Sequence, residues 1–268
     1  MSITPSIEHL SYAEYDARPG LRASQIWRMV EWSPAHAALA CPDSGSMSLG
    51  RAVHCLLLEP GEYPARYWTA GKLDRRTKSG KALANSMEDA HPGAEFLKPE
   101  DAGNADGMLK SIRRHKVANN LLFSGPGDNE VSVFWDMDGV PCKARLDRCT
   151  PDSVIDLKTC RDARSHAFSR AAFGDYGYFL SLYFYSLGLS ALGRPVKNLY
   201  LVAVETDPPH GVNVYLLDTA AQELAHEKIH AALDLYRKHA ETEPWPAYPE
   251  VVTPLLLPAW KAFELSDE

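Results

Sequence analysis

The chain has 268 residues, of which 45% are apolar and 24% charged, and a formal net charge of −7. These proportions are ordinary for a globular protein. No apolar run approaches the roughly 20 residues that a membrane span needs, and the N-terminus lacks the charged-then-apolar order of a signal peptide. The acidic balance counts against a nucleic-acid-binding protein unless positive charge is concentrated locally.

Taken in chain order, residues 1–23 are expected to form an irregular arm. Apolar periodicity, caps and breakers then predict helices over residues 25–32, 34–40 and 48–59, a strand over 63–68, and helices over 81–90 and 99–122, the last broken near residue 116. Strands follow over 130–137, 140–149 and 153–158, then helices over 165–173 and 176–192, strands over 196–205 and 212–217, and a helix over 218–240. Residues 241–268 form a proline-rich tail. This order predicts an α/β fold with a central mixed sheet flanked by helices.

No internal repeat or flexible linker divides the chain, so we expect a single domain over residues 1–268. The five cysteines are scattered and form no C-x-x-C pair: Cys41, Cys55, Cys142, Cys149 and Cys160. This pattern argues against a zinc or iron–sulfur site and predicts a reducing, cytoplasmic location.

The hairpin over residues 140–158 carries two carboxylates and a lysine. Strand side chains alternate between faces, so Asp156 and Lys158 share one face while Ile155 and Leu157 point into the core. Asp147 lies on the preceding, adjacent strand. The three polar side chains can therefore converge on one point.

Two adjacent carboxylates repel each other unless a cation joins them. Oxygen ligands without cysteine suit Mg²⁺ or Mn²⁺. A metal-bound water can then act as a nucleophile, while Lys158 orients it or stabilises charge on the phosphorane. The alternative is a solvated hairpin with ordinary surface ion pairs, which is the commoner meaning of an isolated D-x-K pattern.

Two further features need tertiary structure to interpret. His54 lies on a mostly apolar predicted helix, where a lone histidine is more often structural than a ligand. The run over residues 72–81 is the densest positive stretch of this acidic chain. Such a run is more often a solvated loop, but it is also the local positive charge that nucleic-acid binding requires.

Three motifs together resemble the PD-(D/E)xK nuclease superfamily: G-x-x-x-H at residues 50–54, K-x-R-x-D at 143–147 and D-L-K-T at 156–159. More narrowly, the chain resembles the RecE-type phage exonucleases, that is, the nuclease domain of exodeoxyribonuclease VIII. Four further stretches are similar to that group, namely S-P-A-H at 33–36, H-x-L-L-L-E-P at 54–60, R-R-T-K with G-K at 75–81, and L-P-A-W at 257–260. The resemblance covers about residues 20–262.

The resemblance implies a role for each matching residue. The implied metal ligands are His54, Asp147, Asp156 and the carbonyl of Leu157. The implied catalytic residues are Lys158, Asp156, Asp147, Glu130 and Tyr185. The implied DNA contacts are Arg75, Arg76, Lys78, Lys81, Arg145, Thr159 and Ser181.

The activity implied is Mg²⁺-dependent degradation of linear double-stranded DNA from 5′ ends. It leaves a 3′ single strand for recombination by a partner annealing protein. The resemblance also implies that this chain can assemble into a homo-oligomeric ring. The chain departs from the pattern Q-x-x-x-Y, because Ser181 stands where glutamine is expected, although Tyr185 fits the tyrosine. The alternatives are a RecB-like DNA repair or CRISPR-associated nuclease of other polarity, and a non-catalytic DNA-binding phage protein.

Overall fold

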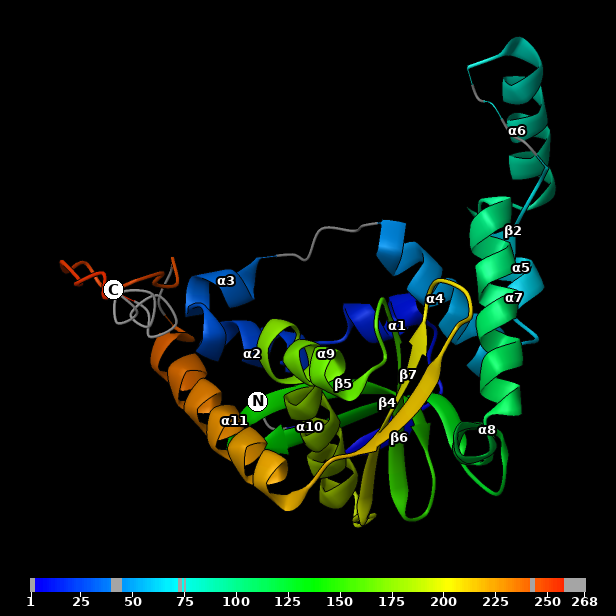
Figure 1. Ribbon diagram of the computed structural model, residues 1–268. Coiled ribbons are helices and arrows are strands. Elements are labelled where there is room, and N and C mark those ends of the chain that lie inside the picture. Colours follow the sequence, from blue (N-terminus) through cyan, green and yellow to red (C-terminus); the bar gives the residue numbers. More distant parts are fainter. Residues whose placement is uncertain (1–2, 40–44, 72–73, 75, 242–243, 258–268) are drawn as a thin grey trace, which may run out of the picture.

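The centre of the fold is a six-stranded sheet in the order β1-β4-β5-β6-β7-β8 (Figure 1). The computed structural model describes residues 3–39, 45–71, 74, 76–241 and 244–257. The strands are β1 (Ser6–Glu8), β4 (Asp128–Met137), β5 (Val140–Cys149), β6 (Ser153–Cys160), β7 (Asn198–Glu205) and β8 (Val212–Leu216). β6 and β7 pair in parallel and the other neighbours are antiparallel. The predicted mixed sheet is therefore confirmed.

The hairpin from β4 to β5 turns at Asp138 and Gly139, which have φ angles of +54° and +84°. Positive φ at both central residues is what a tight two-residue hairpin turn requires, and an Asp-Gly pair supplies it at low cost. The predicted hairpin is confirmed.

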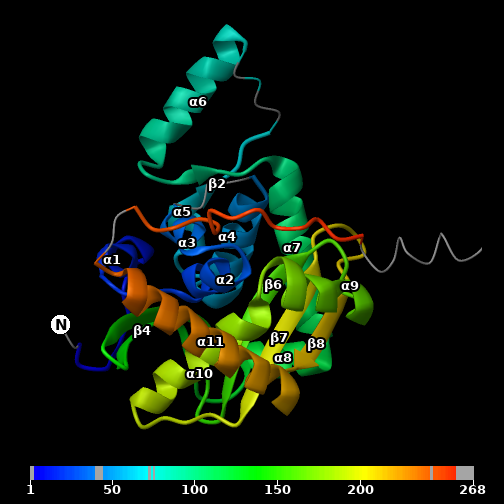
Figure 2. The same cartoon turned by 90° about the vertical axis from the view of Figure 1, so that its left-hand side faces the viewer.

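Helices cover both faces of the sheet (Figures 1 and 2). α2 (Ala23–Glu31), α10 (Tyr178–Ala191) and α11 (Thr219–His239) pack into one apolar core with β4 and β5. α4 (Gly45–Leu58), α7 (Pro99–Arg114) and α8 (Lys116–Phe123) pack into a second core with β6 and β7. Ile155 and Leu157 of β6 belong to the second core, as predicted. Within the described ranges, no helix is long and apolar enough to cross a membrane.

A helical arm projects from the body beside α7 (Figures 1 and 2). It starts after α5 (Tyr63–Arg66), and two short strands, β2 (Tyr67–Trp68) and β3 (Glu95–Phe96), pair in parallel at its base. α6 (Lys78–Ala90) forms the projecting part. The predicted strand over residues 63–68 is wrong for its first four residues, since Pro64 fits the first turn of a helix and α5 forms instead.

The N-terminal segment is ordered, so the prediction of an irregular arm over residues 1–23 is wrong for its described part. β1 pairs with the outer edge of β4. α1 (Tyr12–Ala17) begins with a capping box in which Ser11 and Glu14 satisfy each other's backbone N–H groups. The S-x-x-E signal for this helix is present in the sequence.

Lys143 of β5 holds this segment against the sheet. It is only 2% exposed, and its ammonium group donates hydrogen bonds to the carbonyls of Tyr15 (3.1 Å), Asp16 (2.9 Å) and Arg18. Leu21 also pairs with the backbone of β5. The alternating pattern of β5 predicts that one of its faces is polar. In the structure the N-terminal segment covers this face.

The helix predicted over residues 165–173 is divided. α9 (Ser165–Arg170) passes into a π-helical turn, η1 (Ala171–Asp175). α10 begins at Tyr178, two residues later than predicted, because Gly177 adopts a left-handed conformation with φ +64°. α3 (Pro34–Ala38) ends two residues before its predicted end, and residues 244–257 contain no helix or strand, as expected for a proline-rich tail.

Candidate active site

β5 and β6 separate within the sheet, and the candidate site lies at this separation. Their ladder covers two residue pairs beside the turn, the last of them Arg148 with Ile155. At the next position, Asp147 Oδ2 accepts a hydrogen bond from the N–H of Leu157 at 2.6 Å. The N–H of Leu157 thus donates to a side chain, where in a regular ladder it would donate to a backbone carbonyl of the neighbouring strand. Asp147 and Asp156 stand on the two sides of the separation.

α4 brings His54 to the same place. Val53 is fully buried in the second core, which holds the helix on the sheet. The end of the helix is tied down because Asn129 Nδ2 donates to the carbonyl of Leu58 at 3.0 Å. His54 Nδ1 then lies 3.2 Å from Asp147 Oδ1. Packing on the sheet face therefore carries this helix residue to strands that lie far from it in sequence.

Glu130 of β4 completes the group. Its Oε1 lies 3.9 Å from His54 Nδ1, and one ligand atom each from His54, Glu130 and Asp147 all lie within 4.8 Å of one another. Glu130 has φ +50°, a left-handed conformation that costs about 1–3 kcal/mol for such a residue. The strained backbone therefore occurs at the residue whose carboxylate lies beside Asp147.

Arg145 fixes the strained glutamate. Its Nε donates to Glu130 Oε2 at 2.7 Å, and its NH1 donates to the carbonyl of Leu10 at 2.6 Å. Glu59 lies 3.7 Å away and is itself bound by Arg66 at 2.6 Å. Arg145 is predicted to contact DNA, but in the structure its guanidinium connects the N-terminal segment with Glu130.

Asp156 and Lys158 form a buried ion pair next to this group. Lys158 Nζ lies 2.6 Å from Asp156 Oδ2 and 5.0 Å from the ring centre of Tyr178, which is a cation–π distance. On the same helix, burial and the charge of Asp156 raise the pKa of Tyr185. α10 therefore covers the lysine from the opposite side to α4.

The buried charges perturb one another strongly. Burial raises the pKa of Asp156 to about 6, and burial together with the charge of Asp147 raises the pKa of Glu130. Burial opposes the charge on His54 and Lys158, but the neighbouring carboxylates outweigh it. They raise the pKa of His54 to about 9 and that of Lys158 above its ordinary value. The positive charge of His54 in turn outweighs burial and lowers the pKa of Asp147.

The donor set fits a hard divalent cation. Two carboxylates and an imidazole converge, a third carboxylate lies beside them, and no thiol takes part. Such sets suit Mg²⁺ or Mn²⁺. The group of three contains Glu130, whereas Asp156 is engaged by Lys158. The sequence motif alone favours Asp156 as the ligand, and only the fold shows how close Glu130 lies.

The other predicted site residues lie at varying distances from this group. Thr159 follows Lys158 on β6, and its Oγ1 lies against Gly50 of α4, which brings the G-x-x-x-H and D-L-K-T motifs together. Leu157 contributes its N–H to Asp147, as described above. Ser181 is half-buried and donates to the carbonyl of Gly177 within its own helix at 3.4 Å.

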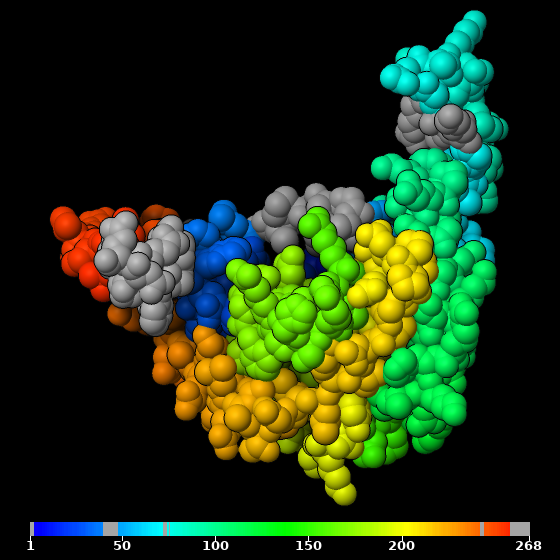
Figure 3. Space-filling view, in the orientation of Figure 1, coloured from blue at the N-terminus to red at the C-terminus, as the bar shows by residue number. Residues whose placement is uncertain are grey.

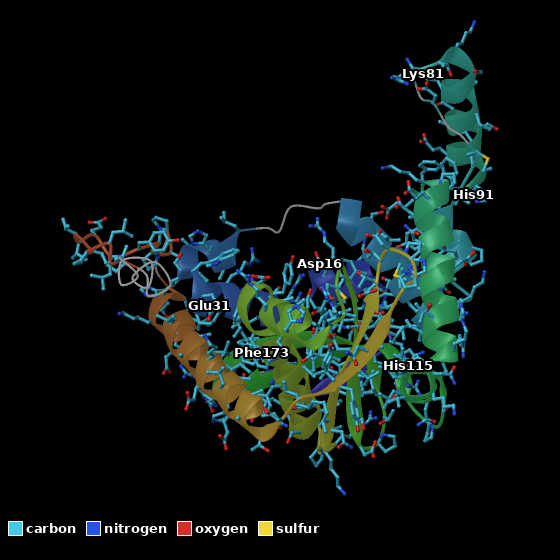
Figure 4. All side chains as sticks on the ribbon, in the orientation of Figure 1. Asp16, Glu31, Lys81, His91, His115 and Phe173 are labelled. Atoms are coloured by element: carbon cyan, nitrogen blue, oxygen red, sulfur yellow. The ribbon has the colours of Figure 1, made fainter. Side chains whose placement is uncertain are left out.

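The described part of the predicted basic run, residues 74 and 76–81, lies on the projecting arm. Arg75 is outside the described residues. Arg76 pairs with Asp74 at 2.9 Å, and Lys78 and Lys81 are exposed on α6. Lys81 lies at the outer end of this helix (Figure 4). None of these described side chains lines the cleft that contains His54, Glu130 and Asp147.

That cleft has a volume of about 1330 Å³, and Figure 3 shows the molecule hollowed beside the loop that follows β6. Cations from several segments line it: Arg18, Arg22, Arg28, Arg51, Arg66, Arg145 and Lys158. His54, Glu130 and Asp147 lie in the same cleft. Sequence reasoning missed the N-terminal arginines because they form no run: Arg18 and Arg22 lie in the segment between α1 and α2, and Arg28 lies within α2.

The mixed sheet, the separated strands and the carboxylate–lysine pair define a nuclease-type α/β fold of the PD-(D/E)xK class. The chain belongs to the family described as PDDEXK-like domain of unknown function (DUF3799), which matches residues 31–253. The superfamily resemblance drawn from the motifs is therefore confirmed. Family and fold together support a nuclease function.

One solved structure agrees with the fold. A crystal structure of a "Putative exonuclease" from Eubacterium rectale superimposes with a TM-score of 0.62 at 11% identity, covering 95% of this chain and 98% of that chain. The structure of the protein SSO0001 matches with a TM-score of only 0.27 at 16% identity, covering 77% of this chain and 84% of that chain. No curated protein matches the chain.

His54→Ala should weaken metal binding without unfolding the protein, because the imidazole touches both carboxylates of the group. Changes to residues that merely support metal ligands cost about 10–100-fold in affinity, so loss of a ligand should raise the half-saturating Mn²⁺ concentration at least tenfold. Calorimetric titration of the DNA-free protein measures this, with His226→Ala, at an exposed position of α11, as the matched control. An unchanged Mn²⁺ affinity with a lower metal-free melting temperature would make His54 a core residue.

Asp156 should make the metal-free protein less stable as pH rises. Its folded pKa of about 6 exceeds its ordinary value of 3.8, so the folded state binds the proton more tightly than the unfolded chain does. The penalty is absent below about pH 4 and fully present above about pH 6, and it is about 3 kcal/mol. Urea unfolding in EDTA of wild type and Asp156→Asn should give a stability difference that shifts in favour of the variant between pH 4 and 7. A difference independent of pH would contradict the assignment.

Proposed function

We propose that the chain is a metal-dependent exodeoxyribonuclease that degrades linear double-stranded DNA. The observation that carries the proposal is the convergence of His54, Glu130 and Asp147 beside the Asp156–Lys158 pair, at the base of a cation-lined cleft. A divalent cation held there supplies Lewis-acid activation of a water and neutralises phosphate charge. His54, Glu130 and Asp147 would hold it, with Asp156 beside them.

Lys158 is the residue suited to act on the phosphate. It keeps its positive charge, because the carboxylates beside it raise its pKa. Asp156 and the ring of Tyr178 fix the position of its ammonium group. A preorganised cation stabilises the negative charge that develops as the phosphodiester is attacked.

The cleft suits a polyanion better than a small ligand. Its volume exceeds the roughly 300–1,000 Å³ of pockets for small molecules, and cations line its walls. Arg28 donates to the carbonyls of Ser24 and Leu39 and, within the described chain, forms no ion pair. Phosphate contacts by such arginines position nucleic acid without reading its sequence.

The finer assignment rests on the resemblance to RecE-type phage exonucleases. We propose 5′-to-3′ degradation that leaves a 3′ strand for a single-strand annealing protein in phage-type recombination, with a homo-oligomeric ring as the assembly. The projecting arm would contact duplex beyond the cleft through Arg75, Arg76, Lys78 and Lys81. Tyr185 stands where the family pattern has its tyrosine, whereas Ser181 is too short to replace the backbone contact that glutamine would make.

If the proposed activity is right, linear duplex DNA is degraded in Mg²⁺ and is not degraded in EDTA. A closed circular duplex survives in both. Asp156→Ala should lower the rate to below a few per cent of wild type, because it removes the anchor of Lys158 and one carboxylate. Circular dichroism checks that the variant is folded. Cleavage of the circle would indicate an endonuclease of the RecB-like type, and binding without cleavage a non-catalytic DNA-binding protein. End-labelling of either strand reports the polarity.

Arg22→Ala with Arg28→Ala should reduce the salt slope of DNA binding by about one unit per lost phosphate contact. The effect should hold for a duplex of about 10 base pairs, roughly 34 Å long, because these arginines line the cleft. Lys78→Ala with Lys81→Ala, a pair of equal charge, should change the slope only for longer duplexes that reach the arm. Titrations in EDTA at several salt concentrations measure both pairs, and a wild-type slope for the first pair would place DNA outside the cleft.

A further inference from the structure

A row of aromatic rings leads from Lys158 to the surface. Lys158 Nζ lies 5.0 Å from the ring centre of Tyr178. The ring of Tyr176 stacks on that of Tyr178, with centres 5.3 Å apart and planes inclined by 13°. Phe168 backs Tyr178 at 6.0 Å. The outermost ring, that of Tyr176, is thus separated from the lysine of the candidate active site by the ring of Tyr178 alone.

Tyr176 is 60% exposed and Phe173, three residues earlier, is 42% exposed. Phe173 stacks on buried Phe179 at 4.9 Å, so its ring is also held from one side. Figure 4 shows Phe173 on the near side of the molecule, next to α10. Two aromatic rings therefore present open surface within one short segment.

The backbone that carries these rings is constrained. Tyr176 N–H donates to the carbonyl of Ala171 at 3.0 Å, which closes the π-helical turn. Gly177 then adopts φ +64°, and a Cβ on it would lie 2.3 Å from the Trp27 ring. π-helical turns are frequent at functional sites. The irregular turn and the left-handed Gly177 therefore fix the backbone where Tyr176 stacks on Tyr178.

We propose that Tyr176 is a stacking platform for an unpaired nucleobase at the DNA end whose phosphodiester lies at Lys158. This inference rests on the proposed nuclease function and adds that the enzyme binds a frayed end in preference to a fully paired one. The occupant follows from chemistry: a flat ring, open on its outer face and separated from a phosphate-binding lysine by the ring of Tyr178, matches a base further along the strand whose phosphate that lysine holds. Stacking accepts any base, as an exonuclease without sequence preference needs.

The test measures binding in EDTA, so that it does not depend on cleavage. Fluorescence anisotropy compares a blunt duplex with the same duplex carrying a few unpaired terminal nucleotides, at the 5′ and at the 3′ end in turn. Tyr176→Ala should weaken binding of the unpaired end by about 5- to 150-fold, the range for one base–aromatic stack. It should change binding of the blunt duplex much less. Tyr176→Phe should bind like the wild type, since it keeps the ring.

A second readout tests stacking directly. 2-Aminopurine placed at the unpaired position should be quenched by wild type and Tyr176→Phe but not by Tyr176→Ala. Tyr248→Ala, which removes a tyrosine of similar exposure (65%) that contacts α3, should behave like wild type. Equal losses on blunt and unpaired DNA, or unchanged quenching in Tyr176→Ala, would overturn the inference alone. Wild-type protein that binds neither duplex would instead overturn the proposed function.

Discussion

The candidate site depends on one hydrogen bond, from the N–H of Leu157 to the carboxylate of Asp147. Within a sheet such a donor normally pairs with the carbonyl of the next strand. Because a side chain takes it, β5 and β6 part while β6 stays paired with β7 along its whole length. The separation lets His54 approach from the helical layer on one face, while α10 covers Lys158 from the other. The cluster is thus assembled from both layers of the fold.

The N-terminal segment contributes more to this site than its short elements suggest. Residues before 31 lie outside the part of the chain matched by the family, yet Arg18, Arg22 and Arg28 line the cleft. Lys143 and Arg145 of β5 bind carbonyls of this segment, and Arg145 also binds Glu130. The same contacts therefore order the segment, form one wall of the cleft and support a carboxylate of the site.

Several cations of the cleft are paired locally with carboxylates, which reconciles the acidic net charge with the proposed polyanionic substrate. Arg18 pairs with Glu8 and Arg22 with Asp16, and these side chains are 30–49% exposed. Ion pairs of this exposure are worth about 0–1 kcal/mol, so exchange of a carboxylate for a phosphate costs little. The buried pairs at the base of the cleft differ, since removal of one partner leaves a charge without compensation in a poorly solvated place. The walls can therefore rearrange around a ligand while the base keeps its geometry.

Local patterns determined the hairpin, the helix that carries His54 and the shared face of Asp156 and Lys158, because alternation, caps and the Asp-Gly turn act over a few residues. Motif spacing also pointed to His54, through resemblance to known nucleases. The position of Glu130, the role of Arg145 and the cleft arginines were decided by tertiary structure. Leu10 and Arg145 are 135 residues apart and meet only in the folded chain, and the left-handed conformation of Glu130 opposes its local preference. Contacts between distant segments leave no periodic signal. The sequence could therefore supply the helices and strands of this site, but not the contacts of Arg145 or the arginines that line the cleft.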